Sequence, residues 1–404
     1  MKNIKKISKS LKFNKNRLFI NKVDLKKIVD NHTTPFYCYS SKEIKQNYKR
    51  FEMSLKKFNP LICYAVKANF NKEIVKILGK LGSGADVVSK GELQLALSSG
   101  IPPDKIVFSG VGKTKEEISY ALKKNIFQIN AESEEEILEI DNIAKNKKKK
   151  INISLRVNPD VDANTHKKIS TGRSEDKFGI PIFKVLELFK KRNTYENIYI
   201  NGIAIHIGSQ ITNIKPFLTA FKKIKNLILE LNKENIFIEN LDLGGGIGIN
   251  YFDNDIIDLK QYSNAIQKNF GKMDLKLIFE PGRSLVGSAG FIISKVIRVK
   301  KGLNKKFLIL DVGMNDLMRP SLYESYHHIL PIEKSKKKIN YEVVGPICES
   351  SDVFGSDRVL NELQSGDYVV ICSAGAYGSC MSSTYNCRPL INEIIINESK
   401  FFKS

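Results

Sequence analysis

Residues 61–100 read LICYAVKANFNKEIVKILGKLGSGADVVSKGELQLALSSG. Two short apolar runs, LICYAVKA (61–68) and ADVVS (85–89), are each followed by a helical pattern, at 72–82 and 91–100. Runs this apolar are typical of strands covered on both faces, because a half-exposed strand would alternate apolar and polar residues. The stretch therefore predicts two consecutive strand–helix units of a parallel sheet.

The same alternation continues to about residue 283. Six further apolar runs predict strands at 106–110, 127–131, 151–159, 198–208, 238–246 and 276–283. Helical patterns separate them at 115–125, 133–145, 182–192, 215–235 and 258–270, and another at 42–55 precedes the first strand. Ser133 and Glu136 predict a capping box at the start of one of these helices. Such repeats form either a doubly wound sheet or a (β/α)8 TIM barrel, and eight repeats in about 250 residues favour the barrel.

After Arg283 the pattern changes to β-rich runs joined by turns. The runs are GFIISKVIRVKK (290–301), KFLILDVG (306–313), YEVVGP (341–346), DYVVICSAG (367–375) and LINEIII (390–396). They predict a second, mainly antiparallel β domain, to which short apolar runs near the N-terminus add strands. We therefore expect residues 39–284 to form the α/β barrel, and residues 1–38 with 285–404 to form the β domain.

The composition excludes several classes of protein. Of the 404 residues, 42% are hydrophobic and 27% charged, which is average globular usage and argues against a disordered chain, a collagen-like fibre and a disulfide scaffold. No apolar stretch approaches the ~18 residues of a membrane span. The six cysteines form no C-x-x-C pair and there are five histidines, so we expect no metal site. No apolar segment of a secretory signal follows Met1, and we expect free thiols in the cytoplasm.

The chain is strongly basic, with 65 Lys and Arg against 43 Asp and Glu, a net charge of +22. Such an excess can indicate nucleic acid or an anionic membrane as a partner. Here it is mostly Lys, in separate runs at 1–16, 145–150 and 334–338, without the interleaved aromatic residues of a platform for stacking bases. We interpret the lysines as solvated surface and expect neither nucleic acid nor a membrane as a partner.

Polar side chains and a run of glycines stand at the ends of the predicted strands, where (β/α)8 barrels place their active sites. They are Lys67, Asp86, Arg156, His206, Ser209, Gly244, Gly245, Gly246, Glu280 and Arg283. Lys67 lies in an otherwise apolar strand, where an unpaired ammonium is costly to bury. Desolvation favours the neutral amine, a nucleophile for aldehydes. A structural ion pair with a nearby carboxylate is an equally good interpretation of this lysine.

Three further features indicate one cofactor. The run GGGIG (244–248) lets backbone N–H groups approach a phosphate, although a simple tight turn is the alternative. Glu280 could hold a pyridinium N–H, or instead form a salt bridge with Arg283 or Arg156. His206 could stack on an aromatic ring, or be an ordinary core histidine. An amine, a phosphate cradle, a carboxylate and a flat ring together match pyridoxal 5'-phosphate better than any other common cofactor.

The sequence resembles the fold-type III pyridoxal-phosphate decarboxylases over roughly residues 20–397. Within that family it is most similar to the members that act on diaminopimelate. The matching motifs are YAVKAN (64–69), GADVVSKGEL (84–93), RVNP (156–159), HKKISTG (166–172), KFGI (177–180), HIGSQ (206–210), LGGGIG (243–248), EPGRS (280–284), DVGMNDLMRPSLY (311–323), CESSDVF (348–354) and AGAYG (374–378). Ser351, where the family more often has Gly or Ala, and Val312 are the small departures.

The resemblance implies roles for individual residues. The implied catalytic residues are Lys67, which bonds to the cofactor aldehyde, His206, which stacks on its ring, Glu280, which holds the ring nitrogen, and Cys348, which protonates the carbanion left by decarboxylation. The implied cofactor-binding residues are these first three with Asp86, Arg156, Ser209, Gly245, Gly246, Gly282, Arg283 and Tyr377. The implied substrate-binding residues are Arg283, Arg319, Tyr323, Glu349 and Tyr377. The resemblance also implies a homodimer whose β domain, through the segment of Cys348 and Glu349, completes the partner's active site.

Decarboxylation of meso-diaminopimelate to L-lysine, the last step of lysine biosynthesis, is thus the expected activity. A decarboxylase of ornithine, lysine, arginine or carboxynorspermidine is the alternative within the family, but those relatives typically have Asp after the Cys and lack the pair Arg319 and Tyr323. Alanine racemase shares the barrel but uses a Tyr as its second base. A non-catalytic protein of the same fold should have lost Lys67, Glu280 or Cys348, and all three are present.

Overall fold

The structure is a computed structural model that describes residues 4–163, 166–169, 171–173, 175–252 and 255–403. Ser170 of the motif HKKISTG, and residues 1–3 of the first basic run, lie outside the described residues. The chain divides into two compact units. We call Tyr48–Gly248 with Ile256–Gly282 the barrel unit, and Met1–Asn47 with Ile249–Asp255 and Arg283–Ser404 the β unit.

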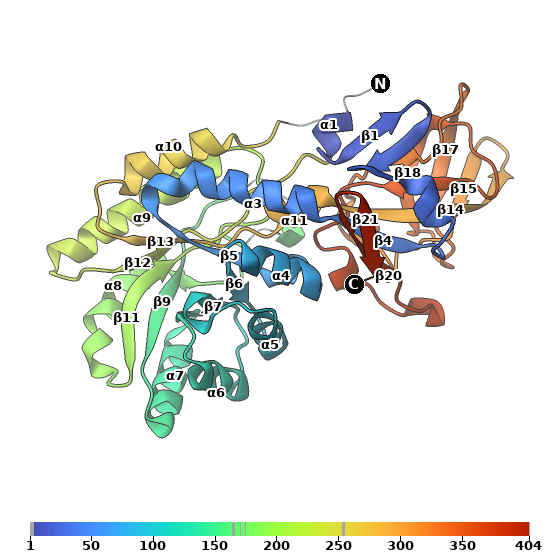
Figure 1. Cartoon of the computed structure of the whole chain (residues 1–404). Coiled ribbons are helices and arrows are strands. Elements are labelled where there is room, and N and C mark those ends of the chain that lie inside the picture. Colours follow the sequence, from blue (N-terminus) through green and yellow to red (C-terminus); the bar gives the residue numbers. More distant parts are fainter. Residues whose placement is uncertain (1–3, 164–165, 170, 174, 253–254, 404) are drawn as a thin grey trace. The chain divides into compact units, whose positions relative to one another are not determined.

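The barrel unit contains a closed ring of eight parallel strands (Figure 1). They are β5 (Leu61–Ala65), β6 (Gly84–Val87), β7 (Ile106–Phe108), β8 (Gln128–Ala131), β9 (Ile151–Asn158), β11 (Ile198–Ala204), β12 (Asn240–Asp242) and β13 (Lys276–Phe279). The pairing of β13 with β5 and of β8 with β9 closes the ring, and β10 (Ile180–Pro181) adds to β9. Each strand lies within a predicted apolar run, except that β6 begins one residue before its run, at Gly84, so the predicted (β/α)8 barrel is confirmed.

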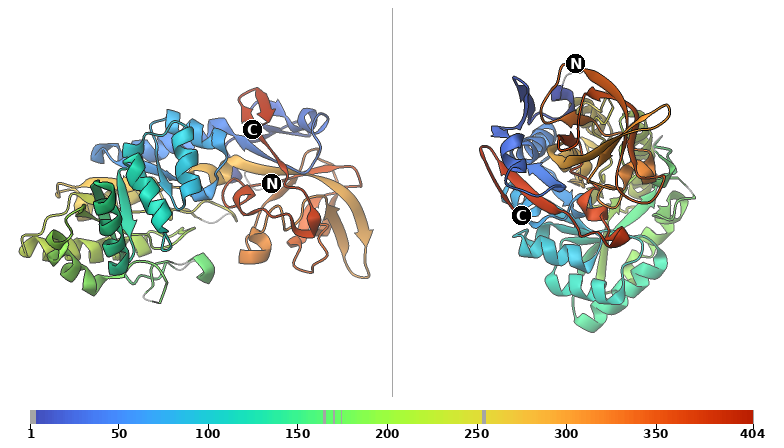
Figure 2. Two further views of the ribbon diagram at one scale, coloured as in Figure 1. Left: turned by 90° about the horizontal axis from the view of Figure 1, so that it is seen from below. Right: turned by 90° about the vertical axis from the view of Figure 1, so that its right-hand side faces the viewer.

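Helices alternate with these strands and cover the outside of the ring (Figures 1 and 2). They are α3 (Ser41–Leu55), α4 (Lys72–Lys80), α5 (Lys90–Ser98), α6 (Lys115–Lys124), α7 (Glu134–Lys147), α8 (Ile182–Lys190), α9 (Lys215–Lys233) and α10 (Leu259–Phe270). All eight predicted helices are thus present. The α9 helix shows why: its buried residues, including Phe217, Phe221, Ile224 and Ile228, recur at the spacing that brings side chains to one helix face.

The predicted capping box of α7 is only half right. Ser133 accepts a hydrogen bond from the backbone N–H of Glu136, as expected of an N-cap. The Glu136 carboxylate, however, accepts from the N–H of Glu132 rather than of Ser133 (2.7 Å), and its other oxygen pairs with Lys113 (2.8 Å). The full capping box is instead made at α6 by Thr114 and Glu117.

The β unit contains two sheets. The larger joins β4 (Phe36–Ser40), β14 (Gly290–Lys301), β15 (Lys306–Leu310), β16 (Ile329–Pro331), β17 (Lys338–Val344), β18 (Val353–Asn361), β19 (Tyr368–Ile371), β20 (Asn392–Asn397) and β21 (Lys400–Lys403). The smaller joins β1 (Leu11–Asn14), β2 (Arg17–Ile20) and β3 (Val23–Asp24). The pairs are antiparallel except β15 with β17 and β4 with β20, so the predicted mainly antiparallel domain is confirmed. Strand β18 was not predicted, because its largely polar, partly exposed residues form no apolar run.

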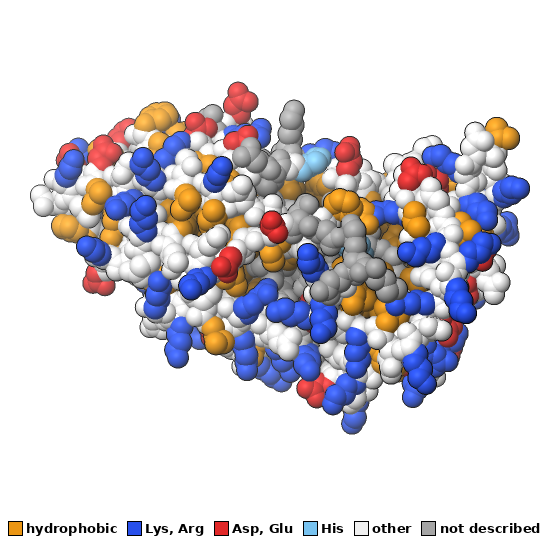
Figure 3. Space-filling view, turned by 90° about the horizontal axis from the view of Figure 1, so that it is seen from above, with side chains coloured by type: hydrophobic (Ala, Val, Ile, Leu, Met, Phe, Trp, Pro, Cys, Tyr) orange, Lys and Arg blue, Asp and Glu red, His pale blue; other side chains and the backbone are white. Residues whose placement is uncertain are grey.

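The surface reflects the basic composition. In the face shown in Figure 3, Lys and Arg side chains are dispersed among polar and apolar ones rather than gathered into one band. Among the described residues, no helix is long and apolar enough to cross a membrane.

Candidate active site

A pocket opens at the carboxyl end of the barrel strands, with a volume of about 320 Å³. Its walls come from the residues that end or follow the strands, which is where barrels of this type place their chemistry. It is lined by Lys67, Val88, Ser109, Gly110, Val111, Asn130, Arg156, Thr171, Phe178, Ala204, Ile205, His206 and Glu280. Four of the predicted site residues, Lys67, Arg156, His206 and Glu280, therefore meet in one pocket.

Lys67 follows β5 in the short 3-10 turn η2 (Val66–Ala68). Its Nζ lies 2.6 Å from Oδ2 of Asp86. Asp86 is the second-last residue of β6 and is fully buried. The ion pair that the sequence left as an alternative is thus present, and the amine still lines the pocket. The other carboxylate oxygen, Oδ1 of Asp86, is buried and has no hydrogen-bond partner among the described residues.

Glu280 lies at the end of β13 beside a second buried carboxyl, that of Asp242. Ser109 Oγ donates to Glu280 Oε1 (3.2 Å), and Asn130 Nδ2 reaches both Asp242 Oδ2 (3.2 Å) and Glu280 Oε1 (3.4 Å). Burial, then the charge of Asp242, raises the pKa of Glu280 well above its usual range. Burial likewise raises the pKa of Asp242, so the interior of the barrel disfavours a charge on both carboxyls.

The two salt bridges that the sequence left open for Glu280 are not made among the described residues. Arg156 pairs instead with Glu132, whose Oε1 lies 2.6 Å from Nη1 of the guanidinium. The guanidinium also lies 4.7 Å from the ring centroid of Phe178. Arg156 is therefore held on the pocket wall by a carboxylate and an aromatic face.

His206 and the glycine turn after β12 support one another. The N–H of Gly245 donates to Nδ1 of His206 (3.2 Å), so the ring accepts at that nitrogen. Burial, together with the charges of Lys67 and Arg156, lowers the pKa of His206 well below its usual range, which keeps the imidazole neutral. A Cβ on Gly245 would lie 2.2 Å from the backbone oxygen of Glu280, and Gly246 has a φ of +101°. Only glycine fits this turn.

Two other predicted residues lie beside these groups in the barrel unit. A Cβ on Gly282 would lie 2.9 Å from Ala68 and 3.1 Å from Ala65, so this glycine lets the segment after Glu280 pack against the turn that carries Lys67. The N–H of Ser209 donates to the carbonyl of Ile169 (3.2 Å), which ties the HIGSQ segment to the loop after β9.

The β unit has its own cluster of predicted residues, centred on two buried arginines. Arg283 Nη1 donates to the hydroxyl of Tyr251 (2.8 Å), and the Arg283 guanidinium lies 4.7 Å from the ring centroid of Tyr377. The Arg319 guanidinium lies 4.4 Å from the Tyr251 ring centroid. Tyr323 ends the short helix α12 (Arg319–Tyr323), which begins at Arg319.

Cys348 and Glu349 lie in the β unit on an exposed loop between β17 and β18. The Glu349 carboxylate accepts hydrogen bonds from the hydroxyls of Tyr385 and Ser351. Ser351, the departure from the family pattern, thus supports Glu349 in this chain.

Several residues of the site were not predicted from the sequence: Asp242, Asn130, Ser109, Glu132, Tyr251 and His327, whose Nε2 lies 3.0 Å from Arg319 Nη1. The first four end or follow predicted strands, so the rule that selected Glu280 would also have selected them. Tyr251 and His327 stand in segments without such a signal.

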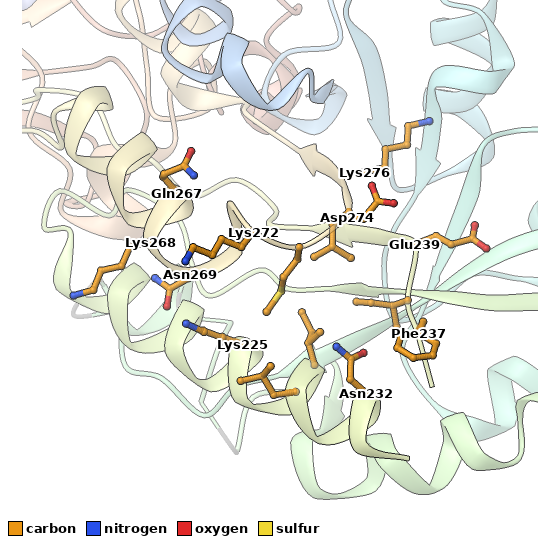
Figure 4. A pocket seen from close by; sticks show the side chains of 15 residues that line it. Lys225, Asn232, Phe237, Glu239, Gln267, Lys268, Asn269, Lys272, Asp274 and Lys276 are labelled. Carbon is orange, nitrogen blue, oxygen red and sulfur yellow. The ribbon is translucent and has the colours of Figure 1, made fainter. Parts of the chain in front are cut away.

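A larger groove, of about 1180 Å³, lies at the opposite end of the barrel strands. Figure 4 shows Phe237, Glu239, Asp274 and Lys276, which come from the segments that precede β12 or begin β13. Because barrels of this type carry their chemistry at the carboxyl end of the strands, this groove is not the candidate active site.

The residues of the smaller pocket fit pyridoxal phosphate. The fully buried carboxylate of Asp86, with one oxygen unpartnered, stabilises a cationic nitrogen at Lys67. The buried carboxyl of Glu280 can bind the ring nitrogen of the cofactor, and the neutral imidazole of His206 can lie against its aromatic ring. Among the described residues, no group of His, Cys, Asp and Glu could hold a metal ion.

Comparison with known proteins agrees with this chemistry. Residues 41–287 match the family model of the pyridoxal-dependent decarboxylase, pyridoxal binding domain. A diaminopimelate decarboxylase of Aquifex aeolicus is 45% identical over 98% of this chain and 94% of its own length. The structure of diaminopimelate decarboxylase from Helicobacter pylori, complexed with L-lysine, is 43% identical, with a TM-score of 0.91 over 94% of this chain and 95% of that one.

A second crystal structure is also similar to this chain. Diaminopimelate decarboxylase from M. jannaschii, in complex with L-lysine, is 38% identical, with a TM-score of 0.94 over 98% of this chain and 95% of that one. The match extends across both units and is not confined to the barrel. The chain therefore belongs to the pyridoxal-dependent decarboxylases, and within them to the diaminopimelate decarboxylase family.

Proposed function

We propose that this chain catalyses the decarboxylation of meso-diaminopimelate to L-lysine and CO2, with pyridoxal 5'-phosphate as cofactor, as the last step of lysine biosynthesis. The observation that carries the substrate assignment is Arg319. The residue is 4% exposed, and the partners of its guanidinium among the described residues, His327, Ser325 and the Tyr251 ring, are neutral. A buried cation with neutral partners is suited to bind an anionic ligand group.

Within the barrel unit, the pocket residues divide the work on the cofactor. The Lys67 amine provides the covalent attachment point, and Asp86 stabilises its charged form. Glu280 binds the cofactor's ring nitrogen and favours its protonated form. The neutral ring of His206 lies against the cofactor's face, and Ser209, Gly245 and Gly246 lie around its phosphate. Arg156 and Gly282, with Arg283 and Tyr377 of the β unit, complete the proposed binding set.

When bound, pyridoxal phosphate supplies the electron sink that accepts the electron pair left on the α-carbon as CO2 departs. The proton that replaces the carboxyl group comes from the Sγ of Cys348, which acts as a general acid. The guanidinium groups of Arg283 and Arg319, with Tyr323, bind the carboxylate at the far end of the substrate. Glu349 binds the far amino group, which is the group a carboxylate recognises.

We further propose that the chain works as a cytoplasmic homodimer in which the segment of Cys348 and Glu349 serves the partner subunit's active site. Both residues are exposed in the chain described, so they are available to another molecule.

The test of the proposed function is a parallel assay. Purified protein with pyridoxal phosphate is incubated with meso-diaminopimelate, L-ornithine and L-lysine, and CO2 and the amine products are followed. We expect L-lysine from diaminopimelate and no turnover of the other two. Turnover of ornithine or lysine with none of diaminopimelate would refute the assignment and would mean that the roles of Arg319 and Glu349 are wrong.

A further inference from the structure

The contacts of Arg319 show how a buried guanidinium is held without a counter-charge. Arg319 Nη1 lies 3.0 Å from Nε2 of His327, and Nη2 donates to Ser325 Oγ (3.2 Å). Its Nε is buried and has no hydrogen-bond partner among the described residues. Burial lowers the pKa of Arg319, but only to about 10, so the side chain keeps its charge at neutral pH.

The hydrogen-bond chemistry determines the tautomer of His327. A guanidinium can only donate, so Nε2 of His327 must accept and carries no proton. The other nitrogen, Nδ1, therefore carries the proton and donates to the carbonyl oxygen of Cys372 (2.8 Å). This carbonyl directly follows β19, and both His327 and Cys372 are fully buried. The sheet thus orients the imidazole, and the imidazole orients Arg319.

The barrel unit offers a comparison within the same chain. Arg156 is also buried, but it is held by the carboxylate of Glu132 at 2.6 Å, which neutralises its charge. Arg319 is held instead by the neutral ring of His327. A carboxylate in place of His327 would hold the guanidinium as well, but it would compete with any anionic ligand.

We propose that His327 is a positioning residue for substrate specificity: it anchors Arg319 through a neutral hydrogen bond and so leaves the guanidinium charge available to the substrate's far carboxylate. This inference rests on the proposed function, because it assigns the ligand of Arg319. The alternative is a purely structural role, in which His327 fills the core and any side chain that fills the same space and bonds to Arg319 would serve.

Two substitutions of similar shape separate these interpretations. In His327→Gln, the side-chain oxygen can accept from Arg319 and the amide N–H can donate to Cys372. In His327→Glu, the side chain has nearly the same shape but adds a negative charge. His327→Leu removes the anchor, and His32→Gln is the matched control, since His32 lies in the β unit against the rings of Phe36 and Phe401.

The probes are L-lysine, which has one carboxylate, and cadaverine, the same carbon chain with two amines and no carboxylate. Their dissociation constants are measured by calorimetry on each protein loaded with pyridoxal phosphate, and a melting curve checks that each variant is folded. We expect His327→Glu and His327→Leu to weaken L-lysine at least about ten-fold, since each disturbs a charge-assisted contact. Cadaverine should change less than about two-fold in both, and His327→Gln and His32→Gln should bind both ligands like the wild type.

Equal weakening of both ligands, or unchanged L-lysine affinity in His327→Glu, would overturn the proposal. If His327→Leu does not fold, the comparison of Gln with Glu decides alone. A wild-type protein that binds cadaverine as tightly as L-lysine would refute the proposed function itself, and His327 would lose its assigned ligand. If instead the wild type prefers L-lysine to cadaverine and the His327 variants show the same preference, the role of His327 is refuted while the proposed function stands.

Discussion

Two buried acidic side chains, Asp242 and Glu280, both accept a hydrogen bond from the amide of Asn130, and Glu280 also lines the pocket. In Glu280→Gln, the amide can still bond to Ser109, Asn130 and Asp242, but it cannot carry a charge opposite a protonated ring nitrogen. We expect kcat for diaminopimelate to fall by about 10²–10³. The melting temperature should not fall, because one buried ionisable group is removed.

Steady-state kinetics and a thermal melt of the same preparation test this expectation. The matched control is Glu239→Gln, at the opposite end of the same strands, which should leave kcat unchanged. An active Glu280→Gln enzyme would show that the carboxylate is dispensable.

Cys348 can be tested against another thiol of the same unit. Cys348 and Cys387 are both exposed and free, but only Cys348 has a proposed role as proton donor. Because a hydroxyl is a much weaker acid than a thiol, Cys348→Ser should lower kcat by about 10²-fold or more, with a smaller change in KM. Cys387→Ser should behave as the wild type. Equal kinetics for the two variants would remove Cys348 from the mechanism.

For individual residues, the sequence identified those of the pocket but not their hydrogen-bond partners. Lys67, His206 and Glu280 follow apolar runs, and that position is visible in the sequence. Asn130, from another strand, donates to both Asp242 and Glu280. Which side chains meet across a barrel depends on strand register, and a one-residue shift would move each to the other face.

The first turn of α5 contains an acidic group whose titration should be measurable. Glu92 accepts a hydrogen bond from the N–H of Val88 (2.9 Å), and burial raises the pKa of Glu92 to about 7. The folded protein therefore binds this proton more tightly than the unfolded chain, whose glutamates titrate near ~4.3. Between pH ~4.3 and ~7 the free energy of unfolding should fall as pH rises, by roughly 2–3 kcal/mol.

Urea unfolding of the wild type and Glu92→Gln across this pH range tests the expectation. The variant has no proton to lose, so it should gain on the wild type as pH rises and exceed it above pH ~7. Glu116→Gln, an exposed position on the neighbouring helix, should leave the wild-type pH dependence in place. Parallel curves for the wild type and Glu92→Gln would contradict this origin of the decline.

Element by element, the barrel was more predictable than the β unit. Its strands are covered on both faces, so each is an apolar run with a helix after it, as at 61–68 and 72–82. In β18 only Phe354 is fully buried, so neither an apolar run nor a clear alternation marks the strand. At α7 the local pattern Ser133–Glu136 suggested a capping box, but Lys113, from another part of the chain, also binds Glu136.

The β unit draws its residues from three separate parts of the chain, and its arginine cluster depends on that arrangement. Arg283, Arg319 and His327 come from the C-terminal part, whereas Tyr251, which contacts both arginines, comes from the segment Ile249–Asp255. No periodicity or motif marks Tyr251 in the sequence, because its role arises only when distant segments pack together.

The proposed homodimer makes a prediction that a single subunit cannot satisfy. If Cys348 serves the partner's active site, then Lys67→Ala and Cys348→Ser are inactive alone but can complement each other. In a mixed dimer one site has both defects, and the other has an intact Lys67 and an intact Cys348. Random reassociation of equal amounts should therefore restore up to about a quarter of wild-type activity, because half of the dimers are mixed and each has one working site.

The measurement is decarboxylase activity after the two variants are dissociated together and allowed to reassociate, with sizing by light scattering. Lys67→Ala mixed with the double variant Lys67→Ala/Cys348→Ser is the control, since no arrangement of its subunits contains an intact Lys67. Restored activity in the first mixture alone would place Cys348 in the partner's site. A dimer that forms but stays inactive would place both residues in sites built from one subunit, whereas a monomeric wild type that remains active would exclude the shared site altogether.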